Sequence, residues 1–381
     1  MQGTHSGAGT TPPPVRTAAA SVPFVSGVGG YASYRVPAAV ATPEGTVVAF
    51  AEGRVGGPSD TGDIDVVARR SEDGGRTWGP PAVVAAGQGD TRGNPSPVVD
   101  PRSGRLVLLT TSNDGRATEK AIMRGEVAAD RSRRVFVQFG TDDGRAFTAP
   151  REITAGAKRP DWRWYATGPG HGIALTGGAH AGRLVVPANH SAAPPDGSGD
   201  TGEEARHYGA HALLSDDGGR TWRVGYTDAR GDGTLNPNES SVAELPDGRL
   251  YFSARDQKGT APGNRAGAHS SDGGETLDGP GYTMQPTLSA VPVVQGAVLR
   301  TPGPDGTLLF SGPSDPAARR AMTLWRSDDG GAAFARVTTV SAAPAAYSDL
   351  VQVDRETVGL LYETGEDGPY ESIAFRALTG L

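Results

Sequence analysis

The chain has 381 residues, including 56 glycines, 30 prolines and no cysteine. The lack of cysteine excludes a disulfide framework, a thiol nucleophile and a thiolate metal site. The length allows a sizeable buried core, and the combined Gly and Pro content stays below the range typical of low-complexity chains. A collagen-like or wholly disordered chain is therefore ruled out. The net charge of −7 argues against a general nucleic-acid binder, and no apolar run reaches the roughly 18 residues of a membrane span.

The first 22 residues are small, polar and proline-rich. Such a composition cannot bury enough apolar surface to offset the entropy of ordering, so we predict a disordered tail over 1–22 and a single folded domain over 23–381. The tail has no apolar stretch typical of a secretory signal. We therefore expect either a cytosolic protein or one whose signal has been removed, and a linker remnant is the alternative explanation of this segment.

A repeated segment follows, with the frame S-x-D-x-G-x-x-[W/L/F]. It occurs as SEDGGRTW (71–78), SDDGGRTW (215–222), SSDGGETL (270–277) and SDDGGAAF (327–334), with a decayed copy, GTDDGRAF, at 140–147. The copies begin 69, 75, 55 and 57 residues apart, which is too long for one hairpin but suits a four-stranded blade with insertions. At roughly 60 residues per blade, the sequence predicts an all-β fold, a six-bladed β-propeller with Asp-box repeats.

Turn chemistry supports this prediction. The Asp-Gly and Asp-Gly-Gly steps of these Asp boxes supply the positive φ that hairpin turns need. Further hairpins are expected in VAELPDGRLYFSAR (242–255) and LVQVDRETVGLLYE (350–363), and SIAFRAL (372–378) is expected to pair with an N-terminal strand. The spacing of acidic residues in the boxes does not match that of an EF-hand calcium-binding loop, so we assign the boxes a structural role.

Charged residues outside the boxes are the candidates for function, because loops from different blades meet at one end of a propeller. In the first half of the chain, Arg35 interrupts an apolar opening strand, and Asp60 lies in a Gly-rich loop. Apolar and polar residues alternate after that loop, as in a β-strand with one buried face, and this pattern places Asp63 and Asp65 at the start of the strand.

The second half contains two more such segments. Glu239 and Arg255 lie at the beginning and end of one predicted hairpin, so an antiparallel pairing brings them to the same end. The last segment, near the C-terminus, contains Arg319, Arg320, Tyr347 and Glu363.

Six motifs together carry a family resemblance. YRVP near the start, the Asp boxes, NES in a hairpin, R-R-x-x-T before the last box, AYSDL and LLYE occur in one order from about residue 23 onward. This pattern resembles the exo-α-sialidases (neuraminidases), most of all the bacterial family 33 glycoside hydrolases. The resemblance implies hydrolysis of terminal α-linked sialic acid from glycoconjugates, with retention, and implies no cofactor and no metal.

The resemblance also implies a catalytic group. Tyr347 of AYSDL matches the nucleophile, Glu239 of NES its acidic partner, and Asp60 the acid/base on a loop. A neutral phenol can approach the anionic anomeric centre of a sialic acid more easily than a carboxylate can, and it can lose its proton to a neighbouring base as it attacks.

The implied substrate-binding residues are Arg35, Arg54, Arg255, Arg319 and Glu363. Arg35, Arg255 and Arg319 match the residues that bind the substrate carboxylate, and we call these three the arginine clamp. Guanidinium groups offer bidentate donors to a carboxylate, at about 1.5 to 3 kcal/mol for each charge-assisted bond. Glu363 matches the carboxylate that holds Arg35. Arg320 remains an alternative to Arg319, although the position four residues before Thr323 favours Arg319.

Other functions are compatible with parts of this pattern. A relative could act on another nonulosonic acid, such as the deaminated form, or transfer the sugar to an acceptor. A non-catalytic sialoglycan-binding propeller would need the arginines but not Tyr347, Glu239 or Asp60. We expect sialylated glycans or related glycosides as the partners, a monomer, and a secreted, extracellular location.

A few aromatic and imidazole side chains are weaker candidates. His207 and His211 are four apart in a strand-like run, about 13 Å along a strand, which is too far for one shared metal. We expect both to be ordinary surface or loop residues. Trp162, Trp164 and Tyr208 could stack on a sugar, but packing explains them equally well.

Overall fold

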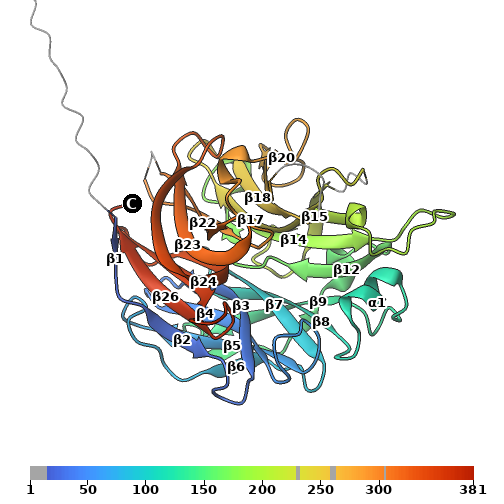
Figure 1. Cartoon of the computed structure of the whole chain (residues 1–381), viewed down its shortest axis with the longest axis horizontal. Helices are drawn as coiled ribbons and strands as arrows, with labels where there is room; N and C mark the ends of the chain where they lie inside the picture. The colour runs from blue at the N-terminus through green and yellow to red at the C-terminus, as the bar shows by residue number, and fades with distance from the viewer. Residues whose placement is uncertain (1–14, 229–231, 258–262, 304–305) are drawn as a thin grey trace, which may run out of the picture.

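The computed structural model describes residues 15–228, 232–257, 263–303 and 306–381. Within these ranges the chain is built almost entirely of β-strands. Figure 1 shows the strands following one another around a common centre, with the chain colour running from blue through green and yellow to red. The predicted all-β class is confirmed. In the described ranges the strand pairing forms four sheets, and two of them each join two antiparallel units, one through a single parallel bridge between Ile64 and Thr91 and one through the long strand Ala335–Gln352. This gives six units, in agreement with the predicted propeller.

The first three units occupy the N-terminal half. The first contains β3 (Ser33–Ala41), β4 (Val47–Arg54), β5 (Ile64–Ser71) and β6 (Ala82–Ala85). The second contains β7 (Thr91–Val99), β8 (Leu106–Asn113), β9 (Arg134–Thr141), β10 (Ala146–Phe147) and β11 (Arg151–Glu152). The third contains β12 (Trp162–Thr167), β13 (Ile173–Ala174), β14 (Leu184–Ala192), β15 (Tyr208–Ser215) and β16 (Arg223–Asp228).

The last three units follow the same plan. The fourth contains β17 (Pro237–Glu244), β18 (Leu250–Asp256), β19 (Arg265–Ser270) and β20 (Thr283–Met284). The fifth contains β21 (Ala297–Arg300), β22 (Leu308–Asp315), β23 (Ala318–Ser327) and the first part of β24 (Ala335–Gln352). The sixth contains the rest of β24, β25 (Thr357–Thr364), β26 (Ser372–Thr379), β2 (Ser21–Val25) and β1 (Arg16–Thr17).

The two ends of the described chain meet in the sixth unit. β2 pairs with β26 through Phe24 and Ile373, and β1 pairs with the end of the same strand. The expected pairing of 372–378 with an N-terminal strand is therefore confirmed. The expected tail boundary at residue 22 is too late, because the β26 edge orders the chain from Arg16; residues 1–14 lie outside the described residues.

The apolar core lies between neighbouring units. Tyr226 packs edge-on against Phe252 at 4.7 Å between the third and fourth units. Trp78 packs against Phe375 at 5.5 Å, which joins the first unit to the sixth. Such aromatic pairs add about 0.5–1.5 kcal/mol to the free energy gained by burying their area. The packing therefore holds each sheet face against the next.

The Asp boxes stabilise turns, as predicted. In the first box the Ser71 hydroxyl donates to Asp73 at 2.7 Å and accepts from the Gly75 amide at 2.7 Å. The boxes that begin at residues 215, 270 and 327 repeat both bonds. Gly75 has φ of 86°, and a Cβ there would lie 2.0 Å from the Phe375 ring, so glycine is required.

Two short α-helices depart from the all-strand expectation. They are α1 (Glu119–Arg124) and α2 (Thr154–Ala157), and short 3-10 turns lie at Gly178–His180, Ala205–His207 and Pro286–Leu288. Thr118 caps α1 by accepting from the Ala121 amide, and Gly125 ends it in the left-handed region. Among the described residues, no helix is long and apolar enough to cross a membrane.

Candidate active site

A cavity of about 260 Å³ lies where the units meet, and most of its lining is polar. Several strands that line it contain a β-bulge at the residue facing the cavity. The register shifts between Arg35 and Ala38 in β3, between Pro237 and Ser240 in β17, and between Ala345 and Ser348 in β24. A bulge adds a residue to one strand and redirects its side chain. Glu239 and Tyr347 lie within such shifts and Arg35 lies directly before one, and all three line the cavity.

Arg35 is held by a buried carboxylate. Its Nε donates to Glu363 Oε1 at 2.7 Å, and the same oxygen accepts from the Val36 amide at 2.9 Å. Although burial disfavours the charged form, Glu363 raises the pKa of Arg35 above its ordinary value. Val36 has φ of 57°, an unfavourable conformation for a β-branched residue, which the bond from its amide to Glu363 helps to maintain.

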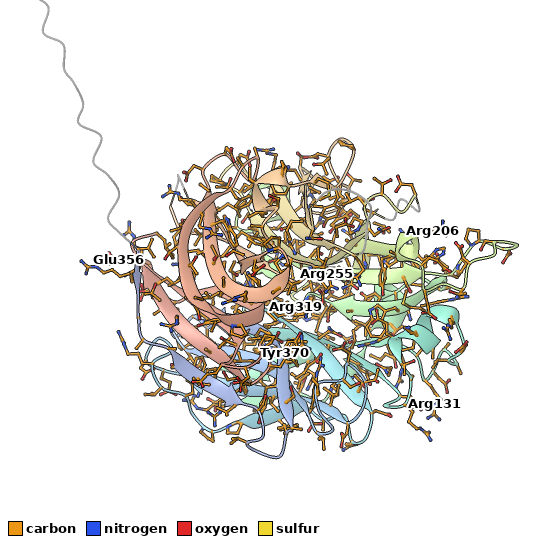
Figure 2. All side chains as sticks on the ribbon, in the orientation of Figure 1. Arg131, Arg206, Arg255, Arg319, Glu356 and Tyr370 are labelled. Atoms are coloured by element: carbon orange, nitrogen blue, oxygen red, sulfur yellow. The ribbon has the colours of Figure 1, made fainter. Side chains whose placement is uncertain are left out.

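The other two clamp arginines come from different units. Arg255, at the end of β18, donates through Nη1 to Glu239 Oε2 at 2.7 Å. Arg319, on β23, lines the cavity, whereas its neighbour Arg320 is exposed and donates to the Ala342 carbonyl at 3.4 Å. The geometry therefore places Arg319, and not Arg320, with Arg35 and Arg255. Figure 2 shows Arg255 and Arg319 near the centre of the molecule.

Tyr347 and Glu239 form a direct pair. The Tyr347 hydroxyl donates to Glu239 Oε1 at 2.6 Å, and Arg255 Nη1 donates to the Tyr347 oxygen at 3.3 Å. The Tyr347 amide donates to Glu363 Oε2 at 3.0 Å, so one carboxylate fixes both Arg35 and the tyrosine backbone. Burial raises the pKa of Tyr347 well above its ordinary value, which keeps the phenol neutral.

Asp60 reaches the cavity from the loop between β4 and β5. Its Oδ1 lies 2.8 Å from Arg54 Nη1, and 64% of its side chain is exposed. Partial desolvation by the surrounding cavity residues raises the pKa of Asp60, but Arg54 and Arg35 lower it more, so the net pKa is below the ordinary value. Arg54 itself is buried and donates through Nε to Glu52 Oε2 at 2.9 Å.

All the predicted site residues thus meet at one cavity, except that Glu363 supports it from behind. Residues 45–361 match the family described as BNR repeat-like domain. The chain is 30% identical over 321 residues to an exo-alpha-sialidase of Aspergillus fumigatus, covering 79% of this chain and 69% of that protein. The chain belongs to the sialidase family. This membership confirms the resemblance seen in the sequence.

Two further relatives agree with that assignment. A sialidase of Micromonospora viridifaciens is 32% identical over 369 residues, covering 94% of this chain and 54% of that protein. The solved Hadza microbial sialidase Hz136 has a TM-score of 0.79 at 25% identity, over 94% of this chain and 68% of that one. The chain described here therefore spans about half the length of the Micromonospora sialidase.

One side of the cavity is lined by Glu119, Arg133 and Trp164, of which only Trp164 was a weak candidate from the sequence, and we call this side the second cavity wall. Glu119, on α1, accepts from the Tyr208 hydroxyl at 2.6 Å, and burial raises the pKa of Glu119. The Arg133 guanidinium lies 3.8 Å from the Trp164 ring centroid and donates to Asn94 at 3.0 Å. These residues come from the second and third units, opposite the fifth and sixth units that supply Arg319 and Tyr347.

Sequence signals existed for part of this wall. Thr118 and Gly125 are capping residue types that mark the ends of α1, so the helix itself could be expected from the sequence, but the place of Glu119 in the cavity could not. The weaker candidate Trp164 lines the cavity, whereas Trp162 packs against His190 at 3.8 Å, outside it. Tyr370, on the connection between β25 and β26, also lines the cavity and gave no signal in the sequence.

The prediction that His207 and His211 are surface or loop residues is wrong for His211, which is buried within β15. His207 ends a short 3-10 turn between two strands, as the loop alternative expects, although its side chain is buried. The two histidines do not contact each other: His207 Nε2 lies 2.9 Å from Asp200, and His211 Nε2 lies 3.1 Å from the Tyr165 hydroxyl. Ligand atoms of Asp200, Glu204 and His207 lie within 4.8 Å of one another, so this group could hold a cation. It lies outside the cavity lining.

Proposed function

We propose that the chain is an exo-α-sialidase that hydrolyses terminal α-linked sialic acids with net retention. The observation that carries the proposal is the 2.6 Å hydrogen bond from Tyr347 to Glu239 beside the arginine clamp. A propeller that only binds sialylated glycans would need the arginines but would have no use for a phenol paired with a base.

The clamp supplies substrate recognition. The carboxylate of a sialic acid sits on its anomeric carbon, so binding it to Arg35, Arg255 and Arg319 brings that carbon close to Tyr347. Each charge-assisted bond contributes about 1.5 to 3 kcal/mol. The net charge of −7 does not oppose binding, because exposed charges are screened within about 8 Å.

In the first step the Tyr347 oxygen attacks the anomeric carbon as the phenolic proton moves to Glu239. The bond from that carbon to the leaving oxygen breaks, and Asp60 donates a proton to this oxygen. The step needs protonated Asp60, whose ion pair with Arg54 favours the charged form. Binding of the substrate at the exposed Asp60 carboxyl must therefore weaken that ion pair.

In the second step the Asp60 carboxylate takes a proton from water. The water oxygen attacks the anomeric carbon, the bond to the Tyr347 oxygen breaks, and Glu239 returns its proton to the phenol. Two successive inversions give net retention. General acid and base assistance of this kind is typically worth about 10² to 10⁴-fold.

The test is hydrolysis of an aryl α-sialoside, followed by NMR of the first-formed sugar. We expect the α-anomer of the free acid, loss of activity in Tyr347→Phe and Arg319→Ala, and near-normal activity in Arg320→Ala. Arg320 is the matched control because it neighbours Arg319 but is exposed. Equal turnover by wild type and Tyr347→Phe, or a β-anomer formed first, would contradict the proposal.

A further inference from the structure

Tyr370 contacts two members of the arginine clamp at once. The Arg35 Cζ atom lies 3.9 Å from the centroid of its ring, and Arg319 Nη1 donates to its hydroxyl oxygen at 2.7 Å. Figure 2 shows Tyr370 and Arg319 close to the centre of the molecule. Tyr370 also lines the cavity, so a carboxylate bound between Arg35 and Arg319 would lie next to its phenol.

The connection that presents Tyr370 is firmly held. The carboxylate of the next residue, Glu371, accepts from the backbone amides of Glu366 at 2.9 Å, Asp367 at 2.8 Å and Gly368 at 2.8 Å. These bonds lower the pKa of Glu371. On the other side, the Ser26 hydroxyl donates to the Tyr370 carbonyl at 2.7 Å. The Tyr370 ring is therefore carried by an ordered segment.

Arg319 depends on this contact for its orientation. Its Nη2 donates to the Val293 carbonyl at 3.1 Å, and the other hydrogen bond recorded among the described residues is the one to Tyr370. No carboxylate pairs with it there, in contrast to Arg35 with Glu363 and Arg255 with Glu239. A long arginine side chain loses rotamer entropy when it is fixed, so an acceptor that is already in place preorganises it.

We propose that Tyr370 is a positioning residue of the clamp, and that its hydroxyl hydrogen is a further donor to the substrate carboxylate. The Tyr370 oxygen accepts from Arg319, and in the described part of the chain its own hydrogen has no recorded acceptor. A carboxylate bound at Arg35 and Arg319 would supply one. The proposal rests on the proposed function, since it assumes that the clamp binds a sialic acid.

The consequence differs from that of losing the nucleophile. A carboxylate is present in the substrate and in the transition state alike, so Tyr370 contributes uniform binding. Removing its hydroxyl should raise KM and leave kcat almost unchanged. A role confined to folding would instead lower the amount of active enzyme without altering KM.

The test compares Tyr370→Phe with Tyr362→Phe. Tyr362 is the matched control because it lies on the same hairpin and its oxygen accepts from Arg376 Nε at 3.2 Å, yet it does not line the cavity. KM is measured with an aryl α-sialoside, and the inhibition constant is measured for a 2,3-unsaturated sialic acid and for its methyl ester. For Tyr370→Phe we expect KM and the inhibition constant of the acid to rise about tenfold, with kcat changed less than about twofold.

The methyl ester decides the mechanism, because it lacks the anionic carboxylate. Its inhibition constant should be the same for wild type and Tyr370→Phe. Unchanged KM in Tyr370→Phe, or an equal loss of affinity for acid and ester, would overturn the proposal about Tyr370. The proposed function would still stand in that case, provided that the wild type hydrolyses the aryl α-sialoside. Failure of the wild type to hydrolyse any α-sialoside would instead reject the proposed function.

Discussion

The Tyr347 hydroxyl donates to the Glu239 carboxylate at 2.6 Å although 108 residues separate them in the chain. Tyr347 comes from the sixth unit and Glu239 from the fourth. Burial raises the pKa of Tyr347 well above its ordinary value, so the nucleophilic role that we propose needs a base in contact with the phenol. Glu239 is in that position, and the proposed covalent step depends on this pair.

Glu239→Gln removes that base. We expect kcat with an aryl α-sialoside to fall about 10² to 10⁴-fold, because the amide cannot accept the phenolic proton. Glu244→Gln is the control on the same strand, since Glu244 bonds Thr176 and does not line the cavity. A Glu239→Gln variant with wild-type kcat would show that the proton goes elsewhere.

Asp60→Ala should distinguish substrates by their leaving groups. For a sugar-linked sialoside, kcat/KM should fall about 10² to 10⁴-fold, because a poor leaving group needs a proton. For a nitrophenyl sialoside the fall should be much smaller. Asp63→Ala, which removes an acceptor for the Gly89 amide, is the control on the same loop. Equal losses for both substrates would argue against Asp60 as the acid.

Glu363→Gln should reduce stability as well as binding. Glu363 is fully buried and accepts from Arg35, the Val36 amide and the Tyr347 amide, so its loss leaves a buried guanidinium without a counter-ion. Breaking a buried pair costs about 3–5 kcal/mol of unfolding free energy, measurable by urea denaturation. Asp328→Asn, which breaks an exposed pair with Arg326, should have little effect. Similar values for both variants would contradict the structural role of Glu363.

A second buried pair predicts a pH-dependent stability. His171 Nδ1 lies 2.8 Å from Asp349 Oδ1; burial lowers the pKa of His171, but Asp349 raises it more, so the net pKa is above the ordinary value. A raised pKa in the folded state adds stability that is complete below about pH 6.5 and is lost as the pH rises through the folded value.

The measurement is urea unfolding of wild type and His171→Gln at several pH values. The wild-type advantage in unfolding free energy should be larger at about pH 6 than at about pH 9. The control is His180→Gln, because that histidine lies on a short surface turn and carries no recorded ion pair among the described residues. A constant difference across the pH range would mean that the pair is not ionised in the folded state.

Much of this arrangement could be predicted from the sequence. The Asp boxes are local motifs whose Ser, Asp and Gly bond within a few residues, so their turns do not depend on distant partners. Hairpin geometry alone placed Glu239 and Arg255 together, and the structure joins them at 2.7 Å. The choice of Arg319 over Arg320 followed from its spacing to Thr323, and strand orientation in β23 agrees.

The second cavity wall could not be predicted in the same way. Glu119 and Arg133 look like surface charges in the sequence, but Glu119 is half-buried and Arg133 is buried where the second and third units pack together around Trp164. The bulges after Arg35 and at Tyr347 could not be predicted either, because the position of an extra residue in a strand depends on its pairing with the neighbouring strand.

In the proposed mechanism Tyr347 becomes covalently bound to the sugar. Mass spectrometry of the protein after incubation with a 3-fluorosialosyl fluoride would detect this bond, because the ring fluorine slows breakdown of a glycosyl-enzyme. We expect one added 3-fluorosialosyl group, located by peptide mapping on Tyr347 and missing in Tyr347→Phe. A label on Glu239 or Asp60, or an active enzyme that gains no label, would contradict this mechanism.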